Sequence, residues 1–306
     1  MADPDRADGR IAVAGATGYI GGLLVERLAG EGAEVAALAR SPQRAERLAG
    51  DRVEVRRADV GEPASLPAAL EGAVTAYYLV HSMGRGSGGG FAERDRRGAE
   101  NFARAASEAG VSRIVYLGGL GEGSEHLDSR HETAQALAGG DVPVAYFRAA
   151  AVIGPGSESF RTVVYLVRRL PLMVTPRWVH NRTQPIAVDD VVPYLVAAGA
   201  LGSEVEREIE IGGPDVTTYA GMMDEAARAM DKRPRPRVSV PLLTPALSSL
   251  WLGLITPVDT GVARPLVEGL SHDTVVTDPS GMALFDLEPM PLAEAMRRAL
   301  AEDPDS

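Results

Sequence analysis

The chain has 306 residues, of which 45% are hydrophobic and 24% are charged, a composition typical of a globular protein with a sizeable buried core. Its formal net charge of -11 argues against a nucleic acid or an anionic membrane surface as partner. The absence of cysteine excludes disulfides, cysteine nucleophiles and thiolate metal sites, and it suits a cytoplasmic protein. The polar amino-terminal residues do not resemble a signal peptide, and no apolar stretch approaches the roughly 20 residues that span a bilayer. We therefore expect a cytoplasmic protein with a small-molecule partner and no metal.

A glycine-rich stretch, Gly-Ala-Thr-Gly-Tyr-Ile-Gly at residues 15–21, is the most informative feature of the chain. The apolar run at residues 10–14 predicts a buried strand before it, and apolar residues at helical spacing predict a helix after it. Glycines at such a turn let a pyrophosphate approach the backbone, and the helix N-terminus attracts its negative charge. The alternative is a glycine-rich turn that binds nothing. The expected cofactor contacts are Gly15, Thr17, Gly18, Tyr19, Ile20 and Gly21.

The next apolar run, residues 34–39, predicts a second buried strand that ends at Arg40. In dinucleotide-binding folds the adenosine ribose lies at this point. An acidic residue there binds the ribose 2′-hydroxyl, whereas an arginine accommodates a 2′-phosphate. Arg40 and Ser41 therefore favour NADPH over NADH, although NADH remains possible. The alternative for Arg40 is a solvated surface side chain.

Two further strands are expected at residues 53–55 and 74–80. After the first, Asp59 can accept a hydrogen bond from the adenine amino group, with Val60 beside it, or it can belong to the N-cap region of a helix at residues 63–70. The second is an almost continuous apolar run, as a strand covered on both faces should be. Its end should face the nicotinamide half of the cofactor through Leu79, Val80 and His81. The glycine-rich residues 84–90 that follow are either a gate over the site or a plain linker.

Strands and helices continue to alternate after this point. The expected elements are a helix at 91–109, a strand at 113–117, a helix at 129–137 and a strand at 142–148. Such alternation over about half the chain predicts an α/β fold with a right-handed, doubly wound parallel sheet, that is, a Rossmann sheet. We expect a dinucleotide-binding core at residues 1–153 and a substrate-binding region at 154–306, interleaved with core elements.

The second half is less regular. Small residues at 149–159 form a loop suited to close approach by the nicotinamide, and the further cofactor contacts expected here and after the fifth strand are Gly118, Ala150 and Val152. The remaining expected elements are a helix at 160–170, a short strand and helix at 184–200, a strand at 208–212, a helix at 218–230, a linker at 232–237 and a helix at 291–301.

Residues 242–270 are strongly apolar and predict a helical hairpin that starts near Pro245 and turns at Pro257. We expect this hairpin to act as a lid over the nicotinamide end of the site. Its inner face would form an apolar wall for the substrate through Trp251, Leu254 and Ile255. The alternative is an ordinary core element or a dimer interface, so the chain is expected to be a monomer or a homodimer.

Five stretches together give the chain a family resemblance. They are residues 15–21, Tyr-Tyr-Leu-Val-His-Ser-Met at 77–83, Tyr-Leu-Gly-Gly-Leu at 116–120, Arg-Ala-Ala-Ala-Val-Ile-Gly at 148–154 and Gln-Pro-Ile-Ala-Val-Asp-Asp at 184–190. With them the chain resembles the extended and atypical members of the short-chain dehydrogenase/reductase superfamily. The resemblance implies a Rossmann core, a nicotinamide cofactor and a carboxyl-terminal substrate region. The chain also resembles the actinobacterial ketoreductases of aromatic polyketide antibiotic pathways, including the angucyclinone type.

The chain departs from that superfamily at the catalytic residues. Members usually carry Tyr-x-x-x-Lys with an upstream serine, whereas Lys232 is the only lysine here and Arg228 stands four residues before it. His126 and Arg130 fall at the tyrosine and lysine positions, and glycines replace the serine. The proton for a reduced carbonyl can come from His126, from a water held by His81 or Ser82, or from a hydroxyl of the substrate. Arg130 can hold ribose hydroxyls or a phosphate.

These features favour an NADPH-dependent ketoreductase that acts on a bulky, apolar, aromatic ketone. The missing serine, tyrosine and lysine favour an alternative, a non-catalytic NADP(H)-binding sensor of the same fold. A third hypothesis is an isomerase or epimerase that uses a bound cofactor transiently.

Overall fold

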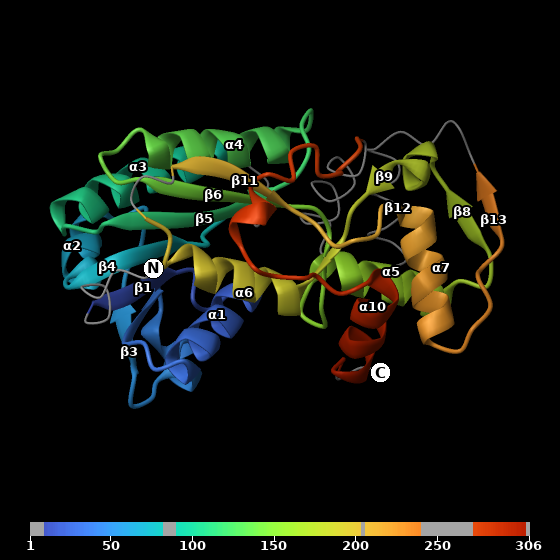
Figure 1. Cartoon of the computed structure of the whole chain (residues 1–306), viewed down its shortest axis with the longest axis horizontal. Coiled ribbons are helices and arrows are strands. Elements are labelled where there is room, and N and C mark those ends of the chain that lie inside the picture. Colours follow the sequence, from blue (N-terminus) through green and yellow to red (C-terminus); the bar gives the residue numbers. More distant parts are fainter. Residues whose placement is uncertain (1–8, 82–89, 203–205, 240–271, 304–306) are drawn as a thin grey trace.

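The computed structural model describes residues 9–81, 90–202, 206–239 and 272–303. The chain forms a layered α/β part and, beside it, a smaller part rich in short strands and helices (Figure 1). The two parts meet where the last sheet strands end, so the carboxyl edge of the sheet faces the smaller part.

Seven parallel strands form the central sheet. They are β1 (Arg10–Ala14), β2 (Val35–Ala39), β3 (Val53–Arg57), β4 (Ala73–Tyr78), β5 (Arg113–Gly119), β6 (Val144–Ala149) and β11 (Arg207–Ile211). Their order is β11-β6-β5-β4-β1-β2-β3, so the direction in which the chain adds strands reverses between β1 and β4. In open α/β sheets the ligand crevice lies at the carboxyl ends of the strands at this reversal.

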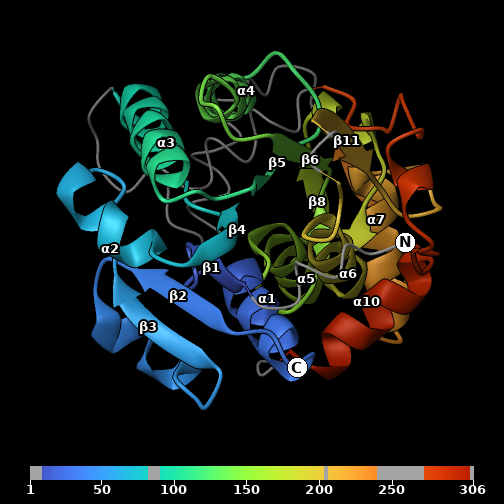
Figure 2. The ribbon, with the colours of Figure 1, turned by 60° about the vertical axis from the view of Figure 1, so that its left-hand side comes forward.

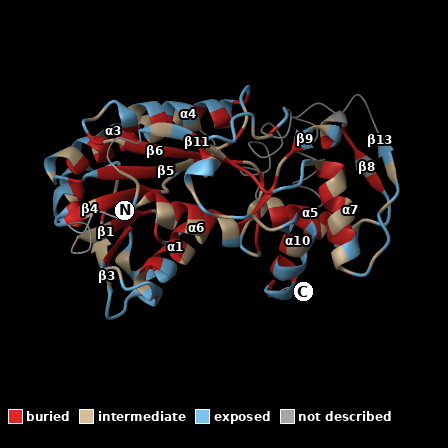
Figure 3. Ribbon diagram, viewed as in Figure 1, coloured by how far each residue is buried: buried red, intermediate tan, exposed pale blue. Residues whose placement is uncertain are grey.

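Helices cover both faces of the sheet, which confirms the expected doubly wound α/β class (Figure 2). One face carries α2 (Leu66–Leu70), α3 (Phe91–Glu108) and α4 (Glu125–Ala138), and the other carries α1 (Tyr19–Gly30) and α6 (Val188–Ala198). Alternate residues of β1 serve the two cores: Ala12 and Ala14 pack with α3, whereas Val13 packs with α1 and α6. The strands are therefore buried on both sides, as their nearly continuous apolar sequences predict (Figure 3).

A third core holds the smaller part together. Its helices are α5 (Glu158–Arg169), α7 (Tyr219–Ala229) and α10 (Leu292–Ala301). Its paired strands are β7 (Val152–Ile153) with β10 (Ile186–Ala187), β8 (Met173–Thr175) with β13 (Arg237–Ser239), and β9 (Arg182–Thr183) with β12 (Thr217–Thr218). Short 3₁₀ turns complete the chain: η2 (Pro42–Arg44), η3 (Glu46–Leu48), η4 (Pro63–Ser65), η5 (Arg177–His180) and η6 (Met282–Leu284).

The structure corrects several expected boundaries. Strand β4 ends at Tyr78, so Leu79 and Val80 already lie beyond the strand. Helix α4 begins at Glu125 rather than at residue 129, because the Ser124 hydroxyl caps it by accepting a 3.2 Å hydrogen bond from the Leu127 N–H. The expected linker at 232–237 leads into β13.

The strands of the smaller part that the sequence did not predict have only two or three residues, too few for an alternating pattern. The predicted helical hairpin at 242–270 lies outside the described residues. No helix in the described part of the chain is both long and apolar enough to cross a bilayer.

Candidate cofactor site

The glycine turn between β1 and α1 has the geometry of a backbone cradle. Gly15 has φ +88°, and a Cβ built there would lie 2.6 Å from the Leu79 carbonyl oxygen. A Cβ on Gly21 would lie 2.2 Å from the Gly15 carbonyl oxygen, so the helix passes directly over the turn. The Gly18 N–H donates to the Gly15 carbonyl at 2.9 Å and closes the turn. Glycine is therefore required at both ends of the motif.

The first turn of α1 is left open to an anion. Gly18 is the N-cap and offers no side-chain hydrogen bond, and the first turn contains no acidic residue. Thr17 and Gly18 are exposed, and Ile20 follows at the start of the helix. The backbone N–H groups and the positive end of the helix dipole therefore point to a place that a pyrophosphate fits.

Tyr19 leaves the turn in another direction and packs on the loop after β7. Its hydroxyl and ring occupy the space that a Cβ on Gly154 or Gly156 would need, at 2.4 and 2.2 Å. Burial raises the pKa of Tyr19 to about 12, against a lowering from its backbone hydrogen bond with Gly156. The Tyr19 side chain thus ties the glycine turn to the smaller part, and its assignment as a cofactor contact stays a prediction.

The end of β2 presents an exposed cation, Arg40, that is unpaired within the described residues. Arg40 and Ser41 are exposed, and within the described residues the Arg40 side chain makes no hydrogen bond or ion pair. On the neighbouring strand β3, Arg57 is by contrast paired with Glu62 at 2.7 Å. Arg40 is therefore available to an external anion at the position where the adenosine ribose lies in this fold.

The loop after β3 places Asp59 and Val60 beside α3. The Asp59 Oδ1 accepts a 2.9 Å hydrogen bond from the Gly61 N–H. Asp59 is not itself an N-cap, but it lies in the N-cap region of α2, because its N–H donates to the hydroxyl of Ser65, the N-cap of α2, and its carbonyl accepts from the same hydroxyl. The Val60 carbonyl accepts a 2.9 Å hydrogen bond from the Asn101 side chain. This loop is therefore anchored at its backbone, while the adenine contact of Asp59 stays a prediction.

The ends of β4 and β1 are joined directly. The Leu79 N–H donates to the Ala14 carbonyl at 2.9 Å, so Leu79 lies against the glycine turn. Leu79 and Val80 are half-buried and His81 is exposed. Ser82 lies outside the described residues. The three residues thus stand at the topological reversal of the sheet, where the sequence expected the cofactor to pass.

Gly118 and Gly119 belong to β5 itself rather than to a loop after it. A Cβ on Gly118 would lie 2.8 Å from the Tyr146 ring, so packing already explains this glycine, and its predicted cofactor contact is not needed to account for it. A Cβ on Gly119 would lie 2.6 Å from the Leu127 side chain and 3.7 Å from Cδ of Arg130. Arg130 therefore extends along the end of β5.

The two proposed catalytic positions lie on α4. His126 is in its first turn and Arg130 is one turn further on. The Arg130 carbonyl accepts a 3.2 Å hydrogen bond from the buried Tyr116 hydroxyl. The backbone thus places both positions beside the end of β5, and only the Arg130 side chain is described.

The loop after β6 completes the same edge. Leu120, after β5, donates its N–H to the Ala149 carbonyl at 2.8 Å and ties the two strand ends together. Ala150 and Val152 follow and are half-buried. The cofactor predictions therefore converge on one sheet edge in space, although the substrate residues Trp251, Leu254 and Ile255 lie outside the described residues. Among the described residues of the chain, no cluster of three or more histidine, aspartate or glutamate side chains could hold a metal.

Sequence reasoning missed the residues that support this edge. Ser124 caps α4, and Arg148 reaches from β6 to the carbonyls of Gly119 and Gly121. One signal was available, because Arg148 is the only charged residue in the apolar run 142–148.

Comparison with known proteins agrees with this geometry. Residues 15–154 match the model of an NAD(P)H-binding family. The ceramide reductase of Caulobacter vibrioides is 28% identical over 240 residues, which cover 75% of this chain and 73% of that protein. Quinone oxidoreductase 2 of Escherichia coli is 33% identical over 135 residues, which cover 41% of this chain and 44% of that protein.

Solved structures share the whole fold. The NADPH-dependent quinone oxidoreductase of Escherichia coli in complex with NADPH superposes with a TM-score of 0.73 at 22% identity, covering 95% of this chain and 99% of that chain. The triphenylmethane reductase of Citrobacter with NADP(H) gives a TM-score of 0.72 at 20% identity over the same shares of the two chains.

The parallel sheet and the glycine turn define a Rossmann fold, and residues 15–154 of the chain are similar to an NAD(P)H-binding family. The matched segment begins at the glycine turn and ends beyond β7, so it contains every predicted cofactor contact named above. The cofactor of this class is NAD(P)H.

Proposed function

We propose that the protein is an NADPH-dependent ketoreductase that reduces a carbonyl group of a bulky, apolar, aromatic substrate. The observation that carries the choice of cofactor is Arg40, an exposed arginine at the end of β2 that is paired with no acid among the described residues. A charge-assisted contact with a 2′-phosphate would distinguish NADPH from NADH.

The chain's own residues divide the remaining tasks. Bound NADPH supplies the hydride that reduces the carbonyl carbon. The glycine turn holds the pyrophosphate, and Leu79 and Val80 support the nicotinamide half. The oxygen of the reduced carbonyl then needs a proton, for which His126 is the proposed donor, with a water held by His81 or Ser82 or a hydroxyl of the substrate as alternatives. Arg130 would hold the ribose or a phosphate.

The substrate class is supported by composition and by the relatives. The relatives are named for ceramide, quinone and triphenylmethane, each of which carries apolar chains or rings. The apolar residues 242–270 of this chain, with Trp251, Leu254 and Ile255, would supply an apolar wall of matching character. An aromatic polyketide ketone of an antibiotic pathway is the finer form of this proposal.

The test is an assay of NADPH oxidation with a panel of aromatic ketones and quinones, followed by identification of the product. We expect oxidation that depends on both protein and carbonyl compound, faster with NADPH than with NADH. Activity with NADH and none with NADPH would contradict the cofactor assignment.

A second function remains because glycines stand at the expected serine position and His126 and Arg130 replace tyrosine and lysine. A non-catalytic NADP(H) sensor would bind the cofactor with a distinct affinity for its oxidised and reduced forms and oxidise none of it. The same assay, combined with binding titrations of both forms, separates the two functions.

A further inference from the structure

Arg148 is a buried cation near the carboxyl end of β6, the second strand from one side of the sheet. It is the penultimate residue of β6 and is only 8% exposed. In the strand register it pairs with Gly118 on β5 and Glu210 on β11, so the three residues form one row across three strands. Paired positions in a sheet share a face, and because Gly118 has no side chain, the Arg148 side chain can extend across it to the end of β5.

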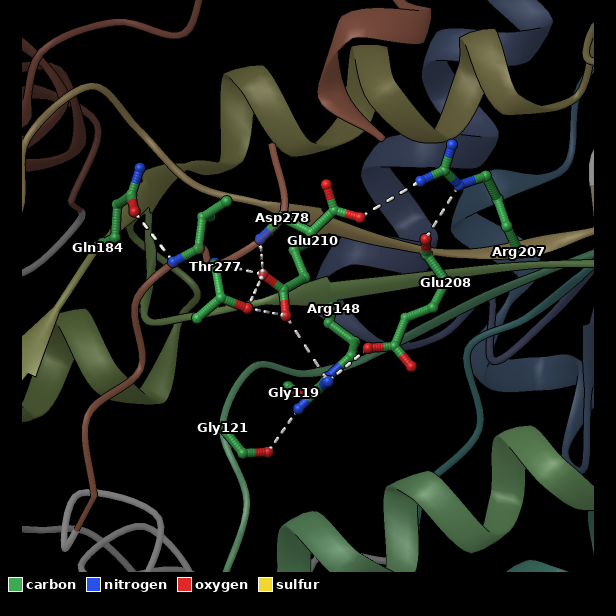
Figure 4. A network of polar contacts seen from close by, with 10 residues as sticks. Gly119, Gly121, Arg148, Gln184, Arg207, Glu208, Glu210, Thr277 and Asp278 are labelled. Atoms are coloured by element: carbon green, nitrogen blue, oxygen red, sulfur yellow. Dashed lines mark hydrogen bonds and ion pairs between the residues drawn. The ribbon is translucent and has the colours of Figure 1, made fainter. Parts of the chain in front are cut away.

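The Arg148 guanidinium has carboxylates on one side and backbone carbonyls on the other (Figure 4). On one side its Nη1 forms an ion pair with Glu208 and lies 3.8 Å from Oε1 of Glu210. On the other side Nη2 donates to the Gly121 carbonyl at 2.7 Å, and Nε donates to the Gly119 carbonyl at 3.3 Å. A buried cation is tolerated only when it is paired in this way, and the planar fork of arginine lets it serve both sides at once.

Glu210 extends the network to the carboxyl-terminal segment. Its Oε2 accepts hydrogen bonds from the backbone N–H of Thr277 at 2.5 Å and of Asp278 at 3.0 Å (Figure 4). The beginning of the same segment lies against the loop between β5 and α4. Thr274 stands 3.0 Å from a Cβ built on Gly121, and the His272 ring stands 3.0 Å from one built on Gly123. Arg148 and this segment therefore hold the loop from two sides.

The loop needs such support because its own sequence gives little. Gly121 and Gly123 have φ +103° and +81°, and glycine has the widest choice of backbone conformations. The loop leads directly to the Ser124 cap, and the first turn of α4 carries His126. Any freedom in the loop would move that turn relative to the end of β5.

We propose that Arg148 is a positioning residue of the active site, which fixes the β5–α4 loop and thereby the first turn of α4. The proposal rests on the proposed reductase function for its kinetic consequence. Arg148 acts through the carbonyls of Gly119 and Gly121, without contact to substrate or cofactor.

The test compares Arg148→Lys with a matched control, Arg56→Lys. Lysine keeps the charge for Glu208 and Glu210 but has no planar fork to reach the carbonyls of both Gly119 and Gly121. Arg56 is also a mostly buried arginine that pairs with a glutamate, Glu54 at 3.0 Å, and donates to backbone carbonyls, but it lies on β3 at the far edge of the sheet. Glu210→Gln is the second variant, which removes one of the two carboxylate charges that face Arg148 and keeps the side-chain shape.

Two measurements are made on each variant. Hydrogen exchange followed by mass spectrometry measures the amide exchange rate of residues 119–128, with α3 as the internal reference. Steady-state reduction of 9,10-phenanthrenequinone measures kcat, and NADPH titration measures the affinity for the cofactor. For Arg148→Lys we expect at least about fivefold faster exchange in 119–128 and a kcat lowered about ten- to hundredfold, with NADPH affinity within about twofold of wild type. Glu210→Gln should also raise the exchange rate of residues 119–128 and lower kcat, but by smaller factors than Arg148→Lys.

Three outcomes decide the matter. Unchanged exchange in residues 119–128 overturns the proposal whatever the activity. Faster exchange with an unchanged kcat also overturns it, because the loop would then be held for stability alone. A wild-type protein that reduces no carbonyl compound defeats the proposed function, while the exchange measurement still decides whether Arg148 holds the loop.

Discussion

Arg40 is the residue on which the choice of cofactor depends. A charge-assisted contact with the 2′-phosphate is worth about 1.5–3 kcal/mol, so Arg40→Asp should weaken NADPH binding more than about tenfold and leave NADH binding nearly unchanged. Fluorescence titration with both cofactors measures this. Arg104→Asp, an exposed arginine on α3, is the matched control and should change neither affinity. Equal losses for the two cofactors would exclude a 2′-phosphate contact.

His126 is the residue to which we assign the proton. If it is the acid, His126→Phe should lower turnover about 10²–10⁴-fold with NADPH affinity nearly unchanged, since a positioned acid contributes about that factor. His131→Phe is the control, because His131 is exposed on the same helix. Retention of most activity would transfer the role to water or to the substrate, which a substrate with its neighbouring hydroxyl methylated would then test.

At the residue scale, the sequence predicted what backbone geometry requires and missed what long-range contacts provide. Gly15 and Gly21 follow from a local turn, and the structure gives each a close backbone approach. Arg148 depends on Glu208 and Glu210, which lie on a strand some sixty residues further along the chain. No local pattern links them. The packing of Gly118 against the ring of Tyr146 on the next strand was missed for the same reason, and its cofactor contact stays a prediction.

Helix α4 is the element that carries the proposed chemistry, and its start depends on a single cap. The Ser124 hydroxyl is buried and accepts from the Leu127 N–H. Ser124→Ala should therefore lower the free energy of unfolding by about 1 kcal/mol, as measured by urea denaturation. Ser107→Ala on α3, whose hydroxyl is hydrogen-bonded to the Asp141 side chain, is the control and should cost less. No loss for Ser124→Ala would mean that the first turn of α4 is held by its tertiary contacts alone.

The helices and strands that the sequence predicted best are the longer ones with a clear repeat of apolar residues. The strands β1, β2 and β5 and the helices α3 and α10 follow the expected ranges to within two residues. The start of α4 was missed because Leu127 is the only apolar residue among residues 125–128 and forms no apolar period there, so only the cap defines this turn. The two- and three-residue strands β8, β9, β12 and β13 owe their extended form to partners distant in the chain.

Buried tyrosines give the whole molecule a predictable response to alkaline pH. Burial raises the pKa of Tyr116 to about 12, and it also raises the pKa of Tyr77, Tyr78 and Tyr146 on the same sheet. The unfolded chain loses these protons near pH 10, before the folded protein does. The free energy of unfolding should therefore be unaffected below about pH 10 and should fall as the pH rises above it.

Two measurements check this response. Tyrosinate absorbance of the native protein should rise at higher pH than that of the urea-unfolded chain, and urea midpoints should fall as the pH rises from about 10 to about 11. Tyr116→Phe should reduce that fall, because it removes one of the titrating groups. If the tyrosines of the native and the unfolded protein titrated at the same pH, the tyrosine side chains of the sheet would be open to solvent and the prediction would be wrong.

At the scale of the whole molecule, strand and helix alternation predicted the sheet, and the reversal between β1 and β4 explains why the predicted cofactor residues converge there. The division of the chain at residue 153 remains a prediction. Two elements from the second half of the chain belong to the larger part, because β11 joins the central sheet and α6 packs on one of its faces. The substrate side depends on residues 242–270, outside the described part of the chain, so its apolar wall rests on composition.

Transfer of deuterium from NADPH labelled at C4 to an aromatic ketone tests the central claim most directly. The protein is mixed with the labelled cofactor and the ketone, and the product is analysed by mass spectrometry. A ketoreductase must place the deuterium on the former carbonyl carbon, so the alcohol should be one mass unit heavier than that made with unlabelled NADPH. Tight NADPH binding with no labelled alcohol from any ketone or quinone of the panel would contradict the account and leave a binding protein in its place.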